Sequence, residues 1–128
     1  MKVLLDTHAL LWTMSGSPRL SGIARSAASN PRNDVFVSVA SVWEAAIKYR
    51  SGKLPEAAPL VNDPRRALIR MRFQHIPIEL NHAKLAASLV SPHKDPFDRM
   101  LAAQALLEGL ALISNDAIFD SMLVTRIW

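Results

Sequence analysis

The sequence predicts an α/β fold, in which a five-stranded, mainly parallel sheet is flanked by helices on both faces. Short apolar segments rich in Val, Ile and Leu alternate along the chain with segments of helical periodicity, and strands separated by helices form parallel sheets through right-handed crossovers. The length of 128 residues is enough for one buried core and too short for two. We therefore expect a single domain over residues 1–128.

The first half of the chain runs strand, helices, strand, helix. "KVLLD" and "VFVSV" are apolar runs typical of buried strands, "HALLWTM" is helical up to Gly16, a second helical region follows Pro18, and "SVWEAAIKYRSG" is helical up to Gly52. The two strands are expected at Lys2–Asp6 and Val35–Val39, and the last helix is expected to start at Ser41.

The second half begins with a proline-punctuated loop, "LPEAAPLVNDP", and a helix through "RRALIRMRF". "HIPI" predicts a third strand, at a sheet edge because Pro77 lacks a backbone donor. "NHAKLAASL" is a helix capped by Asn81, and "PFDRMLAAQALLEG" is the clearest helix of the chain, ended by Gly109. "LALIS" predicts the fourth strand, a helical turn follows Asp116, and "VTRIW" predicts the fifth strand.

The composition narrows the class of protein. There are no cysteines, which excludes a disulfide-stapled module, a zinc ribbon and a thiol enzyme. The N-terminus lacks the long apolar core of a signal peptide, and no run is long enough to cross a bilayer, so we expect a soluble cytoplasmic protein with no membrane partner. The net charge of +4 and pI of about 10.0 favour an anionic partner such as nucleic acid.

Four acidic residues fall where the expected strands end or a neighbouring helix begins. These residues are Asp6, Glu44, Asp98 and Asp116. Sites in parallel sheets form beyond the carboxyl ends of the strands. Carboxylates about 4 Å apart repel by roughly 4 kcal/mol per pair at an effective dielectric near 20, so a cluster needs protons or a cation. Oxygen ligands without His or Cys suit Mg²⁺ or Mn²⁺.

Each acid also has a purely structural explanation. Ser41 and Glu44 have the spacing of a capping box. Asp95 precedes a proline and is a good N-cap, and Asp98 is then an acid in the first helical turn, which the helix dipole favours. The other two acids would cap the segments that follow them. Capping is favoured for Asp95, whereas both explanations stay open for the four acids of the cluster.

Other side chains receive structural interpretations. The histidines contain no pair at the i, i+4 spacing of a zinc motif, so we expect them in loops or at helix ends. Glu44 and Lys48 have the spacing of a helical ion pair. Three aromatic residues on apolar faces are expected in the core: Trp12, Trp43 and Phe97.

Four segments together resemble a known family. "LLDTHALLW", "SVWEAAIK", "HKDPFDRMLAAQA" and "ISNDAIF", in this order, are similar to the four acidic motifs of PIN-domain ribonucleases, and more closely to VapC-type toxins of bacterial toxin–antitoxin pairs. The resemblance covers essentially the whole chain. It implies a cluster that binds one or two Mg²⁺ or Mn²⁺ ions, with metal-binding and catalytic residues at Asp6, Glu44, Asp98 and Asp116.

The resemblance implies metal-assisted hydrolysis of RNA phosphodiester bonds. Thr7 and Asn115, each beside a site acid, are expected to hydrogen-bond the ligands. Basic residues of "PRRALIRMR" are expected to contact RNA, with a solvated helix face or an antitoxin contact as alternatives: Arg65, Arg66 and Arg70. The implied partners are the RNA substrate, a cognate antitoxin that inserts a segment near the acidic pocket, and a second copy of the chain.

Several alternatives remain at the level of sequence. The chain is either a toxin, a PIN nuclease that processes RNA without toxicity, or a non-catalytic PIN-like module that binds RNA or protein. A metal-dependent phosphatase is disfavoured because its motif needs an aspartate where His8 stands. A receiver-like signalling domain usually has adjacent acids after the first strand, and "LLDTH" has one.

Overall fold

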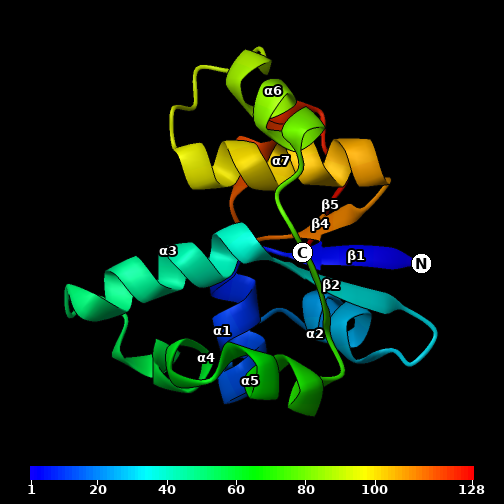
Figure 1. Ribbon diagram of the computed structural model, residues 1–128. Coiled ribbons are helices and arrows are strands. Elements are labelled where there is room, and N and C mark those ends of the chain that lie inside the picture. Colours follow the sequence, from blue (N-terminus) through cyan, green and yellow to red (C-terminus); the bar gives the residue numbers. More distant parts are fainter.

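The computed structural model describes residues 1–128 and contains a five-stranded, all-parallel sheet in the order β3-β2-β1-β4-β5 (Figure 1). The central strand β1 pairs with β2 and β4, so that Leu5 lies opposite Val37 on one side and Ile113 on the other. The predicted fold class is confirmed. The strands are β1 (Lys2–Leu5), β2 (Asp34–Ser38), β3 (Gln74–Ile76), β4 (Ala111–Ile113) and β5 (Arg126–Ile127).

Helices cover both faces of this sheet. Helices α6 and α7 lie on one face, and α1, α2, α4 and α5 lie on the other (Figure 1). The helices are α1 (Thr7–Ser15), α2 (Gly22–Ser29), α3 (Val39–Arg50), α4 (Ala58–Asn62), α5 (Pro64–Met71), α6 (Leu80–Ser88) and α7 (Pro96–Glu108), with 3₁₀ helices η1 (Pro55–Ala57) and η2 (Ala117–Met122). None of the helices is long and apolar enough to cross a membrane.

The alternation of side chains along β1 divides the core in two. Val3 and Leu5 point into the larger cluster, which α1, α2, α4 and α5 close. Leu4 points to the opposite face, where it packs with residues of α7 and with Phe119 of η2. A central strand buried on both faces explains why "KVLL" is apolar without alternation.

The predicted loop between α3 and α5 is wrong, because the segment contains η1 and α4. Ala57 and Leu60 are fully buried in the larger core cluster. Pro55 is the first residue of η1 and Pro59 is the second of α4, positions in the first turn where a missing backbone N–H breaks no helical hydrogen bond. The prolines therefore mark helix starts here.

Two predicted helix starts are also wrong. Helix α3 begins two residues early, at Val39, with Ser38 as its N-cap accepting from the Ala40 N–H at 3.0 Å, so β2 ends at Ser38 and Ser41 lies inside the helix. Helix α6 is capped at Glu79, whose N–H donates to Nδ1 of His82 at 2.9 Å, and the expected cap Asn81 lies within the helix.

Helix α7 is confirmed at both ends. The Asp98 N–H donates to Oδ1 of Asp95 at 2.9 Å, which makes Asp95 the N-cap, and Gly109 ends the helix at φ +66°. The third strand lies at the sheet edge, as Pro77 predicted. Trp43 contradicts its predicted place in the core, because it is 58% exposed and packs edge-on against Phe97 with ring centroids 5.1 Å apart.

Candidate active site

Asp6 leaves the sheet at the carboxyl end of β1 and starts α1. Its N–H donates to the Ile113 carbonyl at 3.1 Å, which extends the β1–β4 ladder by one bond, and its Oδ1 accepts from the Ala9 N–H at 2.7 Å. The side chain is buried, and burial raises its pKa, while hydrogen bonds from the Ser114 hydroxyl and the Ala9 amide oppose the rise. Asp6 is therefore a helix cap and also a buried carboxylate at the carboxyl edge of the sheet.

Glu44 reaches the same edge of the sheet from α3. Its Oε1 accepts from the Thr7 hydroxyl at 2.5 Å and its Oε2 accepts from Nζ of Lys48 at 2.7 Å, and the residue is 5% exposed. The predicted capping box is wrong, because Glu44 turns away from the helix start and the buried Ser41 hydroxyl has no partner. The sequence placed Thr7 beside Asp6, whereas the structure also places it against Glu44.

Asp98 lies in the first turn of α7, where its Oδ2 is 2.7 Å from Nε2 of His93. Burial raises the pKa of Asp98 to about 6, and the neighbouring charges of Asp95 and Glu44 add to the rise. His93 was expected only as a loop residue. It sits in the loop before α7, and the structure shows that its ring contacts a site carboxylate, which no spacing in the sequence indicated.

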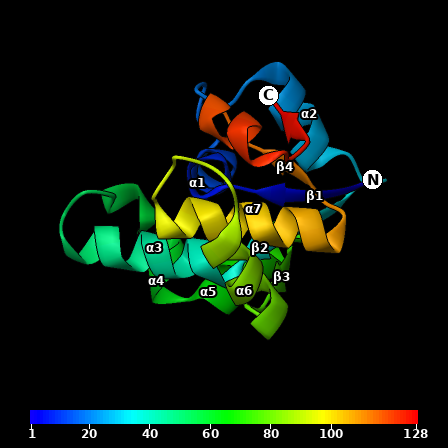
Figure 2. The same cartoon turned by 90° about the horizontal axis from the view of Figure 1, so that it is seen from above.

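Asp6, Glu44 and Asp98 form one electrostatic group, since Glu44 raises the pKa of both aspartates. They come from three elements that meet at the carboxyl edge of the sheet. Figure 2 shows the start of α7 beside α3, and these two helices carry Asp98 and Glu44. We call these three residues the carboxylate rim.

The fourth predicted acid lies further out. Asp116 follows β4, is exposed, and accepts from the Ile118 N–H at 3.0 Å as the cap of η2. Its own N–H donates to the Ser114 hydroxyl at 3.0 Å, and that hydroxyl is also a partner of Asp6. Asn115 is exposed and makes no side-chain hydrogen bond to a site acid, so Ser114 takes the position that the sequence gave to Asn115.

The donor set of the rim fits a hard divalent cation. All of its ligating atoms are carboxylate oxygens, two of the acids have raised pKa values, and the buried Ser41 hydroxyl, one turn before Glu44, is an unpaired oxygen. The structure nevertheless brings no three Asp, Glu or His side chains close enough together to enclose an ion. The acids are instead held by Lys48, His93, Thr7 and backbone amides.

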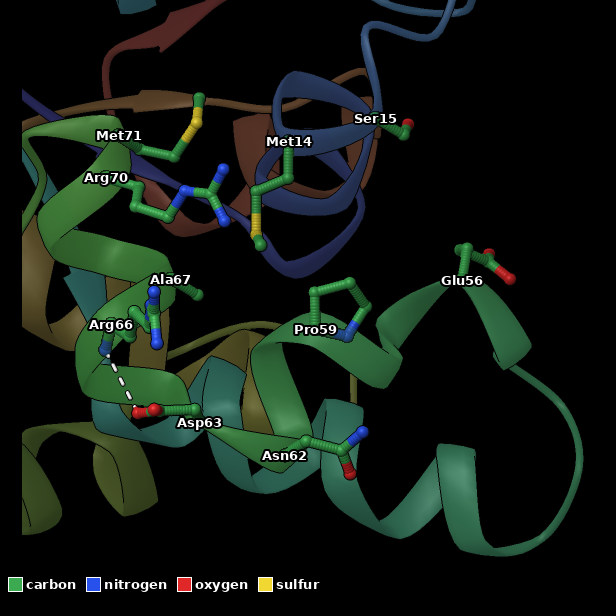
Figure 3. Close-up of a pocket in the computed structure, with 10 residues that line it drawn as sticks. All are labelled: Met14, Ser15, Glu56, Pro59, Asn62, Asp63, Arg66, Ala67, Arg70 and Met71. Atoms are coloured by element: carbon green, nitrogen blue, oxygen red, sulfur yellow. Dashed lines mark hydrogen bonds between the residues drawn. The ribbon is translucent and has the colours of Figure 1, made fainter.

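Two of the predicted RNA-binding arginines lie away from the rim. Arg66 and Arg70 line a cavity of about 580 Å³ between α4, α5 and the end of α1 (Figure 3). Helix α1 starts beside Asp6 and reaches the cavity at Ser15, about 13 Å further along its axis at 1.5 Å per residue. Arg65 is exposed on α5, the helix that carries Arg66 and Arg70, and it does not line the cavity.

Comparison with known sequences identifies a family. The model of the PIN domain matches residues 3–122. Ribonuclease VapC16 of Mycobacterium tuberculosis is 38% identical over 76 residues, which make up 54% of this chain. The match spans 50% of that relative's length.

Comparison with solved structures shows the same fold. VapBC2 from Rickettsia felis, bound to a promoter DNA fragment, superposes with a TM-score of 0.69 at 15% identity, covering 98% of this chain and 97% of that one. VapC20 of Mycobacterium tuberculosis, described as a sarcin-ricin loop cleaving toxin, has a TM-score of 0.67 at 17% identity and 93% coverage of each. The sheet order, the acids at its carboxyl edge and a family match over residues 3–122 agree, and this chain belongs to the PIN-domain family.

Proposed function

We propose that this protein is a divalent-metal-dependent ribonuclease that hydrolyses phosphodiester bonds of RNA, and that it is the toxin of a toxin–antitoxin pair. The observation that carries the proposal is the carboxylate rim, where Asp6 after β1, Glu44 of α3 and Asp98 of α7 meet at the carboxyl edge of the sheet, and burial raises the pKa values of the two aspartates. Such a cluster favours a bound cation over free carboxylates. The similarity to Ribonuclease VapC16 supports RNA as the substrate.

Each acid has a proposed role at the site. Asp6, Asp98 and Asp116 hold the cation, Mg²⁺ or Mn²⁺, and Glu44 completes its coordination or orients the attacking water. When bound, the cation supplies Lewis acidity, which makes the water more acidic and offsets the negative charge on the phosphate oxygens. The Thr7 hydroxyl fixes the direction of Glu44 by donating to its Oε1, and the Ala9 N–H fixes that of Asp6 by donating to its Oδ1.

The decisive experiment is cleavage of structured RNA by the purified protein. We expect fragments with Mg²⁺ or Mn²⁺ and none with EDTA, and we expect Asp6→Asn and Asp98→Asn to abolish cleavage while the circular dichroism spectrum is unchanged. An uncut RNA that the wild type still binds would identify a non-catalytic binding module instead.

The toxin role needs a separate test in cells. Induced expression of the wild type should arrest growth, and expression of Asp6→Asn should not. The solved toxin–antitoxin complexes that share this fold support an antitoxin protein as the partner that relieves the arrest. Growth unaffected by an active nuclease, with no antitoxin present, would reassign the protein to RNA processing.

The arginines of α5 are proposed to contact RNA at a distance from the cut. Arg66 and Arg70 are one turn apart and both face the cavity of Figure 3, so one strand of phosphates could contact both. The double replacement by alanine should weaken binding and reduce the salt slope by about two phosphate contacts. An unchanged slope with weaker antitoxin binding would mark this face as a protein contact.

A further inference from the structure

Lys48 is a positive charge built into the carboxylate rim. It follows Glu44 by one turn of α3, and its Nζ donates to Oε2 of Glu44 at 2.7 Å. That hydrogen bond raises the pKa of Lys48, and the charges of Asp95 and Asp98 raise it further. A lysine ammonium is protonated at neutral pH, and this one lies within electrostatic reach of Asp98 of the carboxylate rim and of the helix cap Asp95.

The alternative explanation is a surface ion pair. The i, i+4 spacing alone would produce such a pair, and it would contribute little to stability. The contacts of Glu44 argue against it. This carboxylate is 5% exposed, and its other oxygen is bound by the Thr7 hydroxyl from α1. Because α1 and α3 together hold Glu44, they also fix the position of the ammonium that contacts it.

The ammonium retains hydrogen-bonding capacity after this contact. It has three N–H donors, of which Glu44 takes one, and no other protein group accepts from Nζ. The Lys48 side chain is 35% exposed, so an incoming ligand can reach it. A phosphodiester oxygen is an acceptor of the complementary charge, and charge-assisted hydrogen bonds of this kind are strong.

We propose that Lys48 is a catalytic residue of the RNA hydrolysis, whose ammonium contacts a non-bridging oxygen of the scissile phosphate and stabilises the charge that develops there. This inference rests on the proposed function. The water oxygen bonds to phosphorus as the bond to the leaving ribose oxygen breaks. The water releases one proton to solvent and the leaving oxygen takes one up, so Lys48 keeps its own protons throughout.

The position of Lys48 lets its ammonium act on the same charge that a second metal ion offsets in other nucleases. Two-metal nucleases use a second ion to offset charge on the reacting phosphate. In this chain, Lys48 supplies a fixed charge at the rim beside Glu44 and near Asp98. Because this charge belongs to the protein itself, we expect removal of Lys48 to leave the binding of the divalent ion intact.

Three variants separate charge from positioning. Lys48→Gln keeps a donor for Glu44 and loses the charge, Lys48→Ala loses both, and Lys48→Arg keeps the charge. The matched control is Lys53→Ala, since Lys53 is exposed just beyond the end of α3 and its loss changes the net charge equally. Single-turnover cleavage at saturating RNA gives the rate, and the electron paramagnetic resonance signal of free Mn²⁺ gives the metal affinity.

We expect Lys48→Gln and Lys48→Ala to cleave roughly 100-fold more slowly, as after loss of one transition-state donor. Lys48→Arg should keep about a tenth of the rate or more, because it preserves the charge but alters the donor geometry. Both neutral variants should bind Mn²⁺ at least as tightly as the wild type, since a competing positive charge is gone. Lys53→Ala should behave as the wild type in both measurements.

Each other outcome overturns a specific statement. Full activity of Lys48→Gln would reduce Lys48 to a holder of Glu44, and full activity of Lys48→Ala would reduce it to a surface ion pair. Loss of Mn²⁺ binding in either variant would show that Lys48 acts by shaping the metal site. A wild type that cuts no RNA overturns the proposed function itself, and this inference with it.

Discussion

At the scale of single residues, the site consists of carboxylates held under mutual repulsion. Asp98 shows this most clearly, because burial, Asp95 and Glu44 together raise its pKa to about 6, although His93 binds its Oδ2 at 2.7 Å. A carboxylate that the fold destabilises at neutral pH is characteristic of functional sites, where affinity for a ligand takes precedence over stability.

We therefore expect Asp98→Asn to stabilise the metal-free protein at neutral pH. The pKa of Asp98 is raised from 3.8 to about 6 in the folded state, so the unfolded chain loses its proton first, and wild-type stability falls as the pH rises between these values. Asparagine at position 98 does not ionise, so the variant does not lose this stability as the pH rises. Thermal unfolding in EDTA should show the variant above the wild type at about pH 8, with a difference that vanishes below about pH 4.

The exposed Asp34 provides the control for this prediction. It lies at the amino end of β2, whereas the site acids lie at the carboxyl ends of the strands. Asp34→Asn should change the melting temperature little at any pH. The electrostatic account fails if Asp98→Asn melts at or below the wild-type temperature throughout the range. Added Mn²⁺ should raise the melting temperature of the wild type more than that of Asp98→Asn, because only the native ligand set is complete.

The positions of the site acids were predictable from the sequence where an apolar run shows the end of a strand. "KVLLD" shows where a buried strand stops, so the place of Asp6 at the rim was predictable. The contacts of Glu44 were not, since they depend on α3 starting at Val39 and crossing Thr7 of α1. A tertiary contact of this kind has no local signal, and neither has the bond between His93 and Asp98.

At the scale of elements, the start of α7 determines where Asp98 points. Asp95 caps this helix through the Asp98 N–H at 2.9 Å, and Pro96 takes the first helical position. Asp95 therefore carries the capping contact, which leaves the side chain of Asp98, three residues later, available for the cation-binding role proposed for it. The place of Asp98 in the first turn of α7 agrees with the structural explanation given for it, and its role as a metal ligand stays a proposal.

Loss of the Asp95 cap should weaken the helix start by about 1 kcal/mol. We expect Asp95→Ala to lower the free energy of unfolding by that amount in urea titrations and to reduce cleavage only partly, since Asp98 is still present. Asp95→Asn retains a capping oxygen and should keep nearly wild-type stability. Equal destabilisation by Ala and Asn would show that the charge of Asp95, rather than its cap, stabilises α7.

Arg99 holds the loop before α7 through backbone carbonyls. Its guanidinium donates to Ala86 at 2.8 Å and Leu89 at 2.6 Å, near the end of α6, and to His93 at 2.9 Å in the loop. These carbonyls have no helical partners to replace the arginine. The loop that carries His93 and Asp95 is thus tied to the helix that carries Asp98.

Replacement of Arg99 by alanine should open this loop. Loss of several charge-assisted bonds to carbonyls is expected to cost roughly 2–3 kcal/mol. Hydrogen exchange should accelerate across residues 89–95, whereas the central strand β1 should change only as far as global stability falls. Arg99→Lys should restore little of the lost stability, because one ammonium cannot reach all of the carbonyl oxygens that the guanidinium contacts. Arg32→Ala, at an exposed turn, is the control that should leave exchange unchanged.

At the scale of the whole molecule, α3 leaves an apolar strip uncovered. Val39, Trp43 and Ile47 recur at four-residue spacing and are 40%, 58% and 46% exposed, and Phe97 of α7 packs against Trp43. The sequence placed Trp43 in a core, and the apolar pattern alone cannot distinguish a face buried in the chain from one buried between chains. Contiguous exposed apolar surface of this kind marks an interaction site.

We propose that this strip is where two copies of the chain associate. Sedimentation velocity should show a dimer for the wild type, and Trp43→Glu should be monomeric with an unchanged circular dichroism spectrum, because the charge is tolerated at an exposed position but not in an apolar interface. Leu123→Glu is the matched control, since Leu123 is 85% exposed just before β5, at the opposite edge of the sheet. A dimer that survives Trp43→Glu but is lost in Leu123→Glu would move the interface to that edge.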